Sequence, residues 1–297
     1  MRIRSVVAWL LPVITITSFS GCEIINPTED TPSYLKINNI TVNPVRNATE
    51  SFGSASANIS DAWVYANGKQ IGVFELPATI PILESGPVEI TVLSGVYADG
   101  MKTARFPYAF YQQFDKTMDL VPGQVIELNP EVRFNDGVKL PLDINEDFSG
   151  KPYFQIIPNN PYKLENNSDT LTDFKYANGS VGVIYANPAT VQPAIIESGF
   201  NGKLPIEGTA VFLEFDYKAS VDFKVGVVVT RNGLSYRDPG NLNVTKRGEW
   251  NKIYLNLTDD ATRTENVGGT FKVFFEMPSS ANPKDYVALD NIRLFHF

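Results

Sequence analysis

The chain has 297 residues, 43% of them hydrophobic, with 25 basic residues against 33 acidic ones and a formal net charge of −8. Such an acidic chain has no general attraction for phosphate backbones or anionic lipid heads, so nucleic acid is not an expected partner. Cys22 is the only cysteine and His296 the only histidine. One cysteine and one histidine are too few ligands for a Cys–His zinc site. They also leave one candidate general base, His296, for nucleophilic catalysis by a Ser–His or Cys–His pair.

The N-terminus carries a secretory signal pattern. Arg2 and Arg4 precede an apolar run over residues 6–17, which is shorter than the ~20 residues of a spanning helix. The small pair Ser20-Gly21 is followed at once by Cys22. This junction resembles the lipobox of bacterial lipoproteins, in which the cysteine receives lipid and becomes the new N-terminus. The alternative is a free thiol buried as a small hydrophobe, but nothing apolar and periodic follows it.

The lipobox resemblance implies that residues 1–21 are removed and that Cys22 anchors the protein in the bacterial cell envelope, in the outer membrane. Residues 22–33 are predicted to be a lipid-anchored tether, because two prolines and three acids occur there without a strand or helix period. The mature chain then has 23 basic and 33 acidic residues, a formal charge of −10. With its one cysteine lipidated, the fold must rely on its core rather than on disulfides.

From residue 34 onward the pattern is that of β-strands: short runs of Val, Ile, Phe and Tyr separated by Gly, Asn, Asp and Pro. The clearest case is residues 62–65 and 70–74, which alternate on either side of Asn67-Gly68, the signature of a two-residue hairpin turn. No window of ten or more residues has a helical apolar stripe. We therefore predict an all-β chain of two β-sandwich domains, residues 34–134 and 142–297, because residues 135–145 interrupt the strand pattern.

The first predicted domain contains residues 61–72, then 76–80, then 84–92, which read as a strand with an Asn-Gly hairpin, a Pro-Ala segment and a Gly-led strand. This order resembles the PEGA domain and related immunoglobulin-like modules of bacterial surface proteins. The resemblance implies an immunoglobulin-like sandwich that acts as a spacer or a support near peptidoglycan. It implies no catalytic residues.

The second predicted domain contains a strand at residues 209–218, a Gly-x-Trp-led strand at 248–257 and a closing strand at 286–294. These segments resemble the galactose-binding-type jelly roll shared by many carbohydrate-binding modules. The resemblance implies a jelly-roll fold and a glycan ligand, although the same fold serves many ligands.

Glu214 and Asp216 lie two residues apart on a predicted strand, so their side chains share one face. We expect a solvated outer face of the sandwich. The alternative is a pair of glycosidase carboxylates, at the ~7 Å spacing of alternate strand residues.

Asp290 is expected to share its strand face with the apolar Ala288, Ile292 and Leu294, and a buried charge needs a partner or a metal. The jelly-roll resemblance implies a structural Ca²⁺ held by an aspartate near the last strand, and Glu146 and Asp147 match the acids at the domain's start. The alternative is that Asp290 caps a bulge or pairs with a basic side chain.

Two further segments are candidate ligand surfaces. Five aromatic residues crowd residues 106–114, and we expect them to pack in a core or between domains, with sugar stacking as the alternative. Residues 231–240 read as a long polar loop, where Arg231, Tyr236 and Arg237 combine planar donors with an aromatic face. Because loops at the end of a sandwich carry function more often than its sheets, these three residues are the predicted ligand-binding residues.

Together these features predict a lipid-anchored, non-catalytic envelope protein that binds a glycan through its jelly roll. Two alternatives stay open: a structural or assembly accessory that docks onto another envelope protein, and a glycoside hydrolase.

Overall fold

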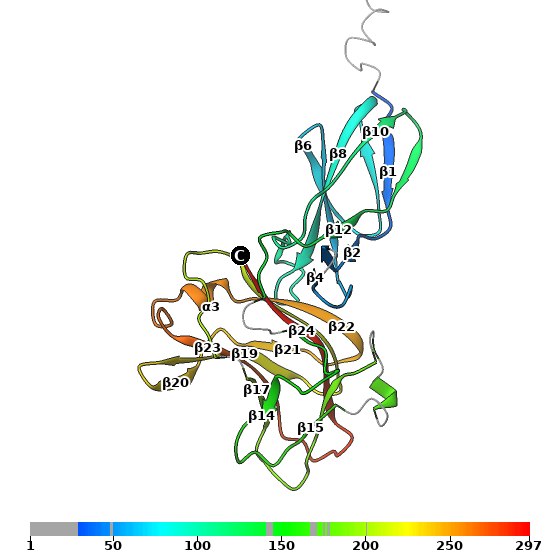
Figure 1. Ribbon diagram of the computed structural model, residues 1–297. Coiled ribbons are helices and arrows are strands. Elements are labelled where there is room, and N and C mark those ends of the chain that lie inside the picture. Colours follow the sequence, from blue (N-terminus) through cyan, green and yellow to red (C-terminus); the bar gives the residue numbers. More distant parts are fainter. Residues whose placement is uncertain are drawn as a thin grey trace, which may run out of the picture.

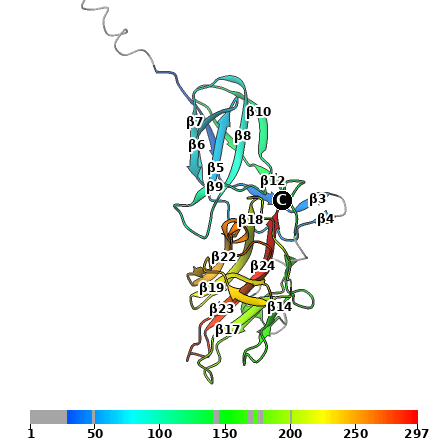
Figure 2. The same cartoon turned by 90° about the vertical axis from the view of Figure 1, so that its left-hand side faces the viewer.

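The computed structural model describes residues 29–47, 50–140, 145–166, 171–174, 176, 179–199 and 201–297. The described chain is nearly all β, as predicted, and forms two sandwiches arranged end to end (Figures 1 and 2). The C-terminus lies at their junction rather than at a free end of the molecule (Figure 1). No helix among the described residues is both long and apolar enough to span a membrane. Cys22, the predicted lipidation site, lies outside the described residues.

The N-terminal sandwich is the smaller of the two. One sheet has the order β11 (Val125–Leu128), β1 (Ser33–Ile37) and β7 (Ala78–Ile82). The other has the order β10 (Phe114–Leu120), β8 (Gly86–Tyr97), β5 (Asp61–Ala66) and β6 (Lys69–Glu75), with β9 (Arg105–Pro107) paired to β8. Two short pairs complete it: β2 (Thr41–Asn43) with β12 (Glu131–Arg133), and β3 (Val45–Asn47) with β4 (Glu50–Ser51).

The predicted hairpin is confirmed as β5 and β6. Asn67 and Gly68 both have positive φ, 47° and 77°, which is what a two-residue turn between right-twisted strands requires. Ala62 and Val64 are fully buried, in agreement with the alternation in the sequence.

The C-terminal sandwich is a jelly roll of two larger sheets. The first has the order β15 (Leu164–Glu165), β16 (Gly182–Tyr185), β24 (Tyr286–His296), β18 (Val211–Ala219) and β22 (Arg247–Asn256), with β13 (Asn145–Glu146) on β24. The second has the order β14 (Phe154–Ile156), β17 (Ala194–Ser198), β23 (Thr270–Met277), β19 (Phe223–Arg231) and β20 (Leu234–Arg237), with β21 (Leu242–Val244) on β19. A 3₁₀ turn, η2 (Thr172–Phe174), and a short helix, α3 (Thr258–Thr262), lie in the connections.

Strand β24 contains a bulge that the sequence pattern did not predict. Glu214 pairs with Arg293 and Asp216 with Asp290, so two residues of β24 oppose one residue of β18. Asn291 takes the left-handed conformation there, with φ 48°, and a bulge of this kind reverses the alternation of side chains along the strand. The expectation that Asp290 shares a face with Ile292 and Leu294 is therefore wrong.

Residues 231–240 are not the long polar loop that we predicted. Residues 231–237 belong mostly to the hairpin of β19 and β20, whose turn is Asn232-Gly233 with φ of 53° and 78°. This is a second Asn-Gly turn with the same backbone requirement as the first. The side chains of β20 are all exposed, so this strand does not alternate between apolar and polar residues. The sequence pattern therefore did not reveal it as a strand.

Aromatic side chains fill the junction between the two sandwiches. Tyr108, Phe110 and Tyr111, which follow β9, are buried in the hydrophobic cluster of the N-terminal sandwich. That cluster also includes three residues of the C-terminal sandwich, Phe212, Tyr254 and Phe295. The prediction of core or interdomain packing for these aromatics is confirmed. The predicted domain limits themselves stay a prediction.

Candidate functional site

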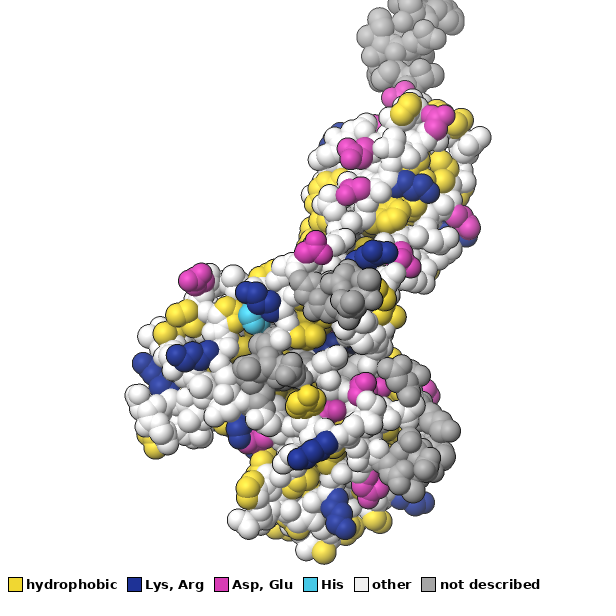
Figure 3. Space-filling view, viewed as in Figure 1, with side chains coloured by type: hydrophobic (Ala, Val, Ile, Leu, Met, Phe, Trp, Pro, Cys, Tyr) yellow, Lys and Arg dark blue, Asp and Glu magenta, His cyan; other side chains and the backbone are white. Residues whose placement is uncertain are grey.

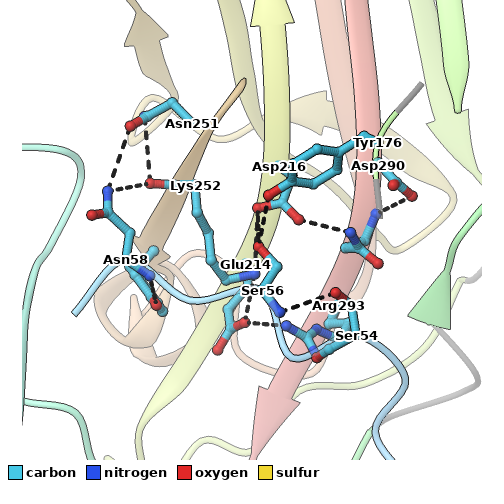
Figure 4. A network of polar contacts seen from close by, with 12 residues as sticks. Ser54, Ser56, Asn58, Tyr176, Glu214, Asp216, Asn251, Lys252, Asp290 and Arg293 are labelled. Carbon is cyan, nitrogen blue, oxygen red and sulfur yellow. Dashed lines mark hydrogen bonds and ion pairs between the residues drawn. The ribbon is translucent and has the colours of Figure 1, made fainter. Parts of the chain in front are cut away.

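A polar network lies buried beneath the junction, on the face of the β22–β18–β24 sheet that meets the N-terminal sandwich (Figure 4). Glu214 and Asp216 are both fully buried. The expectation of a solvated outer face is therefore wrong, because the N-terminal sandwich covers the face on which these side chains lie. Strand alternation did place the two acids on one face, but nothing local to the strand says that a second sandwich packs there.

Glu214 is held by partners from both sandwiches. It accepts hydrogen bonds from the Tyr108 hydroxyl at 2.6 Å and from the Arg293 guanidinium at 3.0 Å. The Lys252 ammonium lies 3.1 Å from the same carboxylate. Burial alone would raise the pKa of Glu214, but the two cations and the hydroxyl donor together hold it below its usual value.

Arg293 and Asp216 extend the network across the junction. Arg293 donates to the backbone carbonyls of Phe52 and Ser54, at 3.0 and 2.9 Å. Asp216 accepts from the Ser56 hydroxyl at 2.8 Å and from the Asn291 side chain at 2.7 Å. The chain that leads into β5 is thus fixed to the sheet by buried, charge-assisted hydrogen bonds.

Asp290 lies at the edge of this network and has one carboxylate oxygen without a hydrogen-bond partner. The other oxygen accepts the backbone N–H of Asn291 at 2.7 Å, so Asp290 caps the bulge, which was the alternative that the sequence left open. Burial, reinforced by the negative charges of Asp216 and Asp147, raises the pKa of Asp290 to about 8. With Asp290 protonated, the two carboxylates Glu214 and Asp216 balance the two cations Lys252 and Arg293.

The predicted Ca²⁺ ligands are not gathered into one cluster. Glu146 accepts backbone N–H groups of Phe148 and Tyr153, and Asp147 accepts from Ser149. Among the residues that the structure describes, no three His, Cys, Asp or Glu side chains lie close enough to hold a metal ion. Glu146 and Asp290 come from neighbouring strands, since Glu146 pairs with Ile292, but the described geometry gives the Ca²⁺ prediction no support.

A polar pocket of about 250 Å³ opens beside this network, between the two sandwiches. We call it the interdomain pocket. The N-terminal sandwich and the chain that leads into it contribute Asn58, Tyr97, Asp99, Gly100 and Lys102. The C-terminal sandwich contributes Tyr217, the three residues of β21, Thr245, and the β22 residues Arg247, Asn251, Lys252, Ile253 and Tyr254. Lys252 ties this pocket to Glu214, because its buried ammonium forms the ion pair described above.

A tight turn at residues 98–101 builds one wall of the pocket. Asp99 and Gly100 have positive φ, 54° and 67°, and Met101 donates its N–H to the Ala98 carbonyl. The turn is bound to β22: Asp99 donates its N–H to the Tyr254 carbonyl, and its carboxylate accepts the N–H of Asn256, both at 2.9 Å. The Asp-Gly pair is a turn signal that could have located this wall from the sequence, but its docking onto β22 could not be foreseen.

Several polar groups of the pocket are not used by the fold. The Tyr97 hydroxyl is buried with no hydrogen-bond partner. Among the described residues, no side-chain hydrogen bond is formed by Asn243 or Thr245, and no carboxylate lies within ion-pair distance of Arg247. At the edge of the pocket, the Asn58 side-chain amide lies 3.5 Å from the Asn251 Oδ1 atom and donates a hydrogen bond to the Lys252 backbone carbonyl at 3.2 Å. This combination of unused donors, acceptors and tyrosine rings can bind a small polar molecule.

The three predicted ligand-binding residues have their polar atoms occupied instead. Arg231 donates to the carbonyls of Thr264 and Glu265, and the Tyr236 hydroxyl donates to Glu265 and lies 2.8 Å from the Asn266 side chain. Arg237 pairs with Glu276 and lies over the Phe274 ring, 4.5 Å from its centroid. These contacts fix the β19–β20 hairpin to its neighbours. The structure does not bring the three residues together with the interdomain pocket.

The face of the molecule in Figure 3 shows charged side chains of both signs dispersed over both sandwiches rather than gathered in a basic patch. No protein-family model matches the chain, and neither does any curated protein.

Several solved structures resemble part of the chain. A family 30 carbohydrate-binding module of a cellulosomal cellulase of Clostridium thermocellum is 19% identical with a TM-score of 0.34, over 51% of this chain and 90% of the module. A family 61 module solved with β-1,4-galactotriose is 13% identical with a TM-score of 0.34, over 54% of this chain and 99% of the module. The enzymatically active domain of tailspike protein 4 of bacteriophage CBA120 is 15% identical with a TM-score of 0.36, over 52% of this chain but only 22% of that domain. Likenesses at this level assign no ligand or activity.

Proposed function

We propose that this protein is a lipid-anchored, non-catalytic carbohydrate-binding protein of the bacterial envelope, and that the interdomain pocket is its binding site. The observation that carries the proposal is the set of polar side chains in that pocket that are left largely free by the fold: Asn243 and Thr245, which form no side-chain hydrogen bond among the described residues, and Arg247, which has no described carboxylate as a partner. The solved carbohydrate-binding modules resemble the chain too weakly to add weight to the argument.

The chemistry of the pocket suits a saccharide. Sugar hydroxyls donate and accept hydrogen bonds, and amide side chains do both, as do tyrosine and threonine hydroxyls. Tyr97, which is half-buried, adds a ring whose apolar body can contact a pyranose. The volume of about 250 Å³ is below the ~300–1,000 Å³ of pockets that enclose drug-sized ligands. The pocket therefore takes one end or one residue of a glycan rather than a long chain.

The arrangement of acids argues against glycoside hydrolysis at this site. Most glycosidases use two carboxyl groups that flank the scissile bond. Among the residues that the structure describes, Asp99 is the only acid that lines the pocket, and one of its oxygens already accepts the N–H of Asn256. Glu214 and Asp216 are fully buried behind Lys252, where no sugar can reach them.

Binding is tested with the mature chain, kept soluble by Cys22→Ser, on an array of bacterial and plant glycans followed by calorimetry. We expect Asn243→Ala to weaken the binding of the selected glycan about 5- to 100-fold, as for the loss of one or two well-placed hydrogen bonds. Tyr236→Ala and Arg237→Ala are matched controls on the β19–β20 hairpin and should leave the affinity unchanged.

Weak binding by the two hairpin variants together with normal binding by Asn243→Ala would contradict the pocket. It would show that the glycan binds to the β19–β20 hairpin, as the sequence predicted. Absence of binding to every glycan would reject the function and favour the accessory that docks onto an envelope protein.

The lipid anchor is tested separately in a bacterial host. We expect the wild-type chain to incorporate a fatty-acid probe and to fractionate with the outer membrane, because Ser20-Gly21-Cys22 forms the lipobox-like junction. Cys22→Ser should abolish labelling and leave the precursor uncut. Ser20→Ala keeps a small residue at the junction and should be labelled normally. Equal labelling of the wild type and Cys22→Ser would contradict the anchor.

A further inference from the structure

We propose that the interdomain pocket selects a saccharide that carries a carboxylate, such as a uronic acid, and that Arg247 and Lys102 bind this carboxylate from opposite sandwiches. This inference rests on the proposed function and names the class of glycan that the pocket takes. It arises from the charges of the pocket, which differ in sign from those of the chain as a whole.

The pocket is lined by three cationic side chains, Lys102, Arg247 and Lys252, and by one acid, Asp99, in a chain with a formal net charge of −8. Lys252 is committed to Glu214 and Asp216, from which its ammonium lies 3.1 and 3.8 Å away. Two cations therefore remain to face a ligand.

Of Arg247 and Lys102, Arg247 has fewer charged partners. It is exposed at the start of β22, and no described carboxylate lies within ion-pair distance of it. Arg247 lines the pocket beside Tyr217. Burial raises the pKa of the Tyr217 hydroxyl, and the positive charge of Arg247 and its hydrogen bond to that hydroxyl oppose the rise. This one neutral partner leaves other N–H groups of the guanidinium for a ligand. A planar guanidinium in this position can hold a carboxylate through two parallel hydrogen bonds.

Lys102 lies across the pocket, on the segment that follows the 98–101 turn. Its ammonium is 3.7 Å from Glu75, and both side chains are largely exposed. Exposed pairs of this kind contribute only ~0–1 kcal/mol, so a ligand carboxylate can compete for the ammonium.

Asp99 would repel an anionic ligand only weakly. Its carboxylate accepts the N–H of Asn256 at 2.9 Å, and burial raises its pKa. Its charge is thus partly offset by the backbone donor and shielded by its position in the wall. Arg247 and Lys102 therefore make the electrostatic potential of the pocket positive. The side chains of Asn243 and Thr245 remain available to the sugar hydroxyls.

The experiment compares each glycan with its own uncharged form. Oligosaccharides of galacturonate, glucuronate, mannuronate and guluronate are titrated by calorimetry against the mature chain, beside the same oligosaccharides with their carboxyl groups reduced to alcohols. We expect at least one acidic series to bind ten or more times more tightly than its reduced counterpart, with an affinity that falls as salt is raised from 50 to 500 mM, because salt screens exposed charges.

The two cations are then removed singly. Arg247→Ala and Lys102→Ala should each reduce the preference for the acidic over the reduced form by about fivefold or more, while binding of the reduced form stays nearly constant. Arg247→Lys keeps the charge but loses the planar fork, so it should retain part of the preference. Lys69→Ala removes an exposed cation of the β5–β6 hairpin, which does not line the pocket, and should change nothing.

The outcomes separate the inference from the function on which it rests. Binding of neutral glycans with no preference for a carboxylate would overturn the inference and leave the carbohydrate-binding function standing. A preference that survives both alanine variants would also overturn it. Failure of both charged and neutral saccharides to bind would overturn the function together with the inference.

Discussion

Arg293→Ala should lower the free energy of unfolding by about 3–5 kcal/mol, the usual cost of removing one partner from a buried ion pair. Arg293 is 1% exposed, and its guanidinium joins Glu214 to the backbone carbonyls of Phe52 and Ser54. Without it, the Glu214 carboxylate and both carbonyls lose a donor in a region closed to solvent. Urea denaturation followed by tryptophan fluorescence and circular dichroism measures the change.

Two controls separate the buried network from a general loss of charge. Lys36→Ala breaks an exposed pair with Glu127 and should cost less than about 1 kcal/mol. The double variant Glu214→Gln with Arg293→Met removes both charges together and should recover part of the stability lost in Arg293→Ala. A loss below about 1 kcal/mol for Arg293→Ala would show that water reaches the junction and that the two sandwiches are not held by this network.

Asp290→Asn should stabilise the protein at alkaline pH. The raised folded-state pKa of Asp290, about 8, compares with ~3.9 for an unfolded aspartate. The folded protein therefore holds one extra proton between these two pH values. The stability that this proton contributes is complete below about pH 4 and is lost as the pH rises through about 8.

Asparagine resembles the protonated form of Asp290 at every pH and can still accept the N–H of Asn291. The stability difference between Asp290→Asn and the wild type should therefore grow steadily from pH 5 and level off above pH 8. The upper limit of this difference is about 6 kcal/mol, at ~1.36 kcal/mol per unit of pKa shift. Urea denaturation at pH 5, 7 and 9 measures it.

Asp260 has its pKa raised to about 7 by burial and by the neighbouring Asp238, so the wild-type stability contains a second contribution of the same sign. That contribution is present in both proteins and cancels in the difference. Glu89→Gln changes an exposed carboxylate of β8 and should show no such pH dependence. A stability difference that stays constant from pH 5 to pH 9 would mean that Asp290 is ionised in the folded protein throughout.

The fold class and some of its details follow from local patterns in the amino-acid sequence. Alternation around Asn67-Gly68 located the β5–β6 hairpin, because strand periodicity and the positive φ of a two-residue turn are properties of neighbouring residues. The lack of a helical stripe determined that the described chain is nearly all β. The crowding of aromatics at residues 106–114 indicated a packing surface, since rings of this size are rarely left in solvent.

The sequence also contains a complementary charge pattern on three of its strands. Glu214 and Asp216 lie on one predicted strand, and Lys252 and Arg293 lie on two others. Cations within otherwise apolar strands are a signal of buried pairing, because an unpaired charge in such a position is costly. Which strands are neighbours, however, is set by the order of the sheet, which residues far apart in the chain determine together.

Which faces are covered, and where the polar residues meet, depends on how the two sandwiches pack together. The face of β18 that carries Glu214 is buried because a second sandwich packs on it, and no property of β18 specifies that contact. The bulge at Asn291 reverses the side-chain alternation of β24, so a one-residue irregularity moved Asp290 to the opposite face. The interdomain pocket depends on the packing of the two sandwiches, because its walls come from segments such as Asp99 and Asn256, 157 residues apart, that meet only when the 98–101 turn docks onto β22.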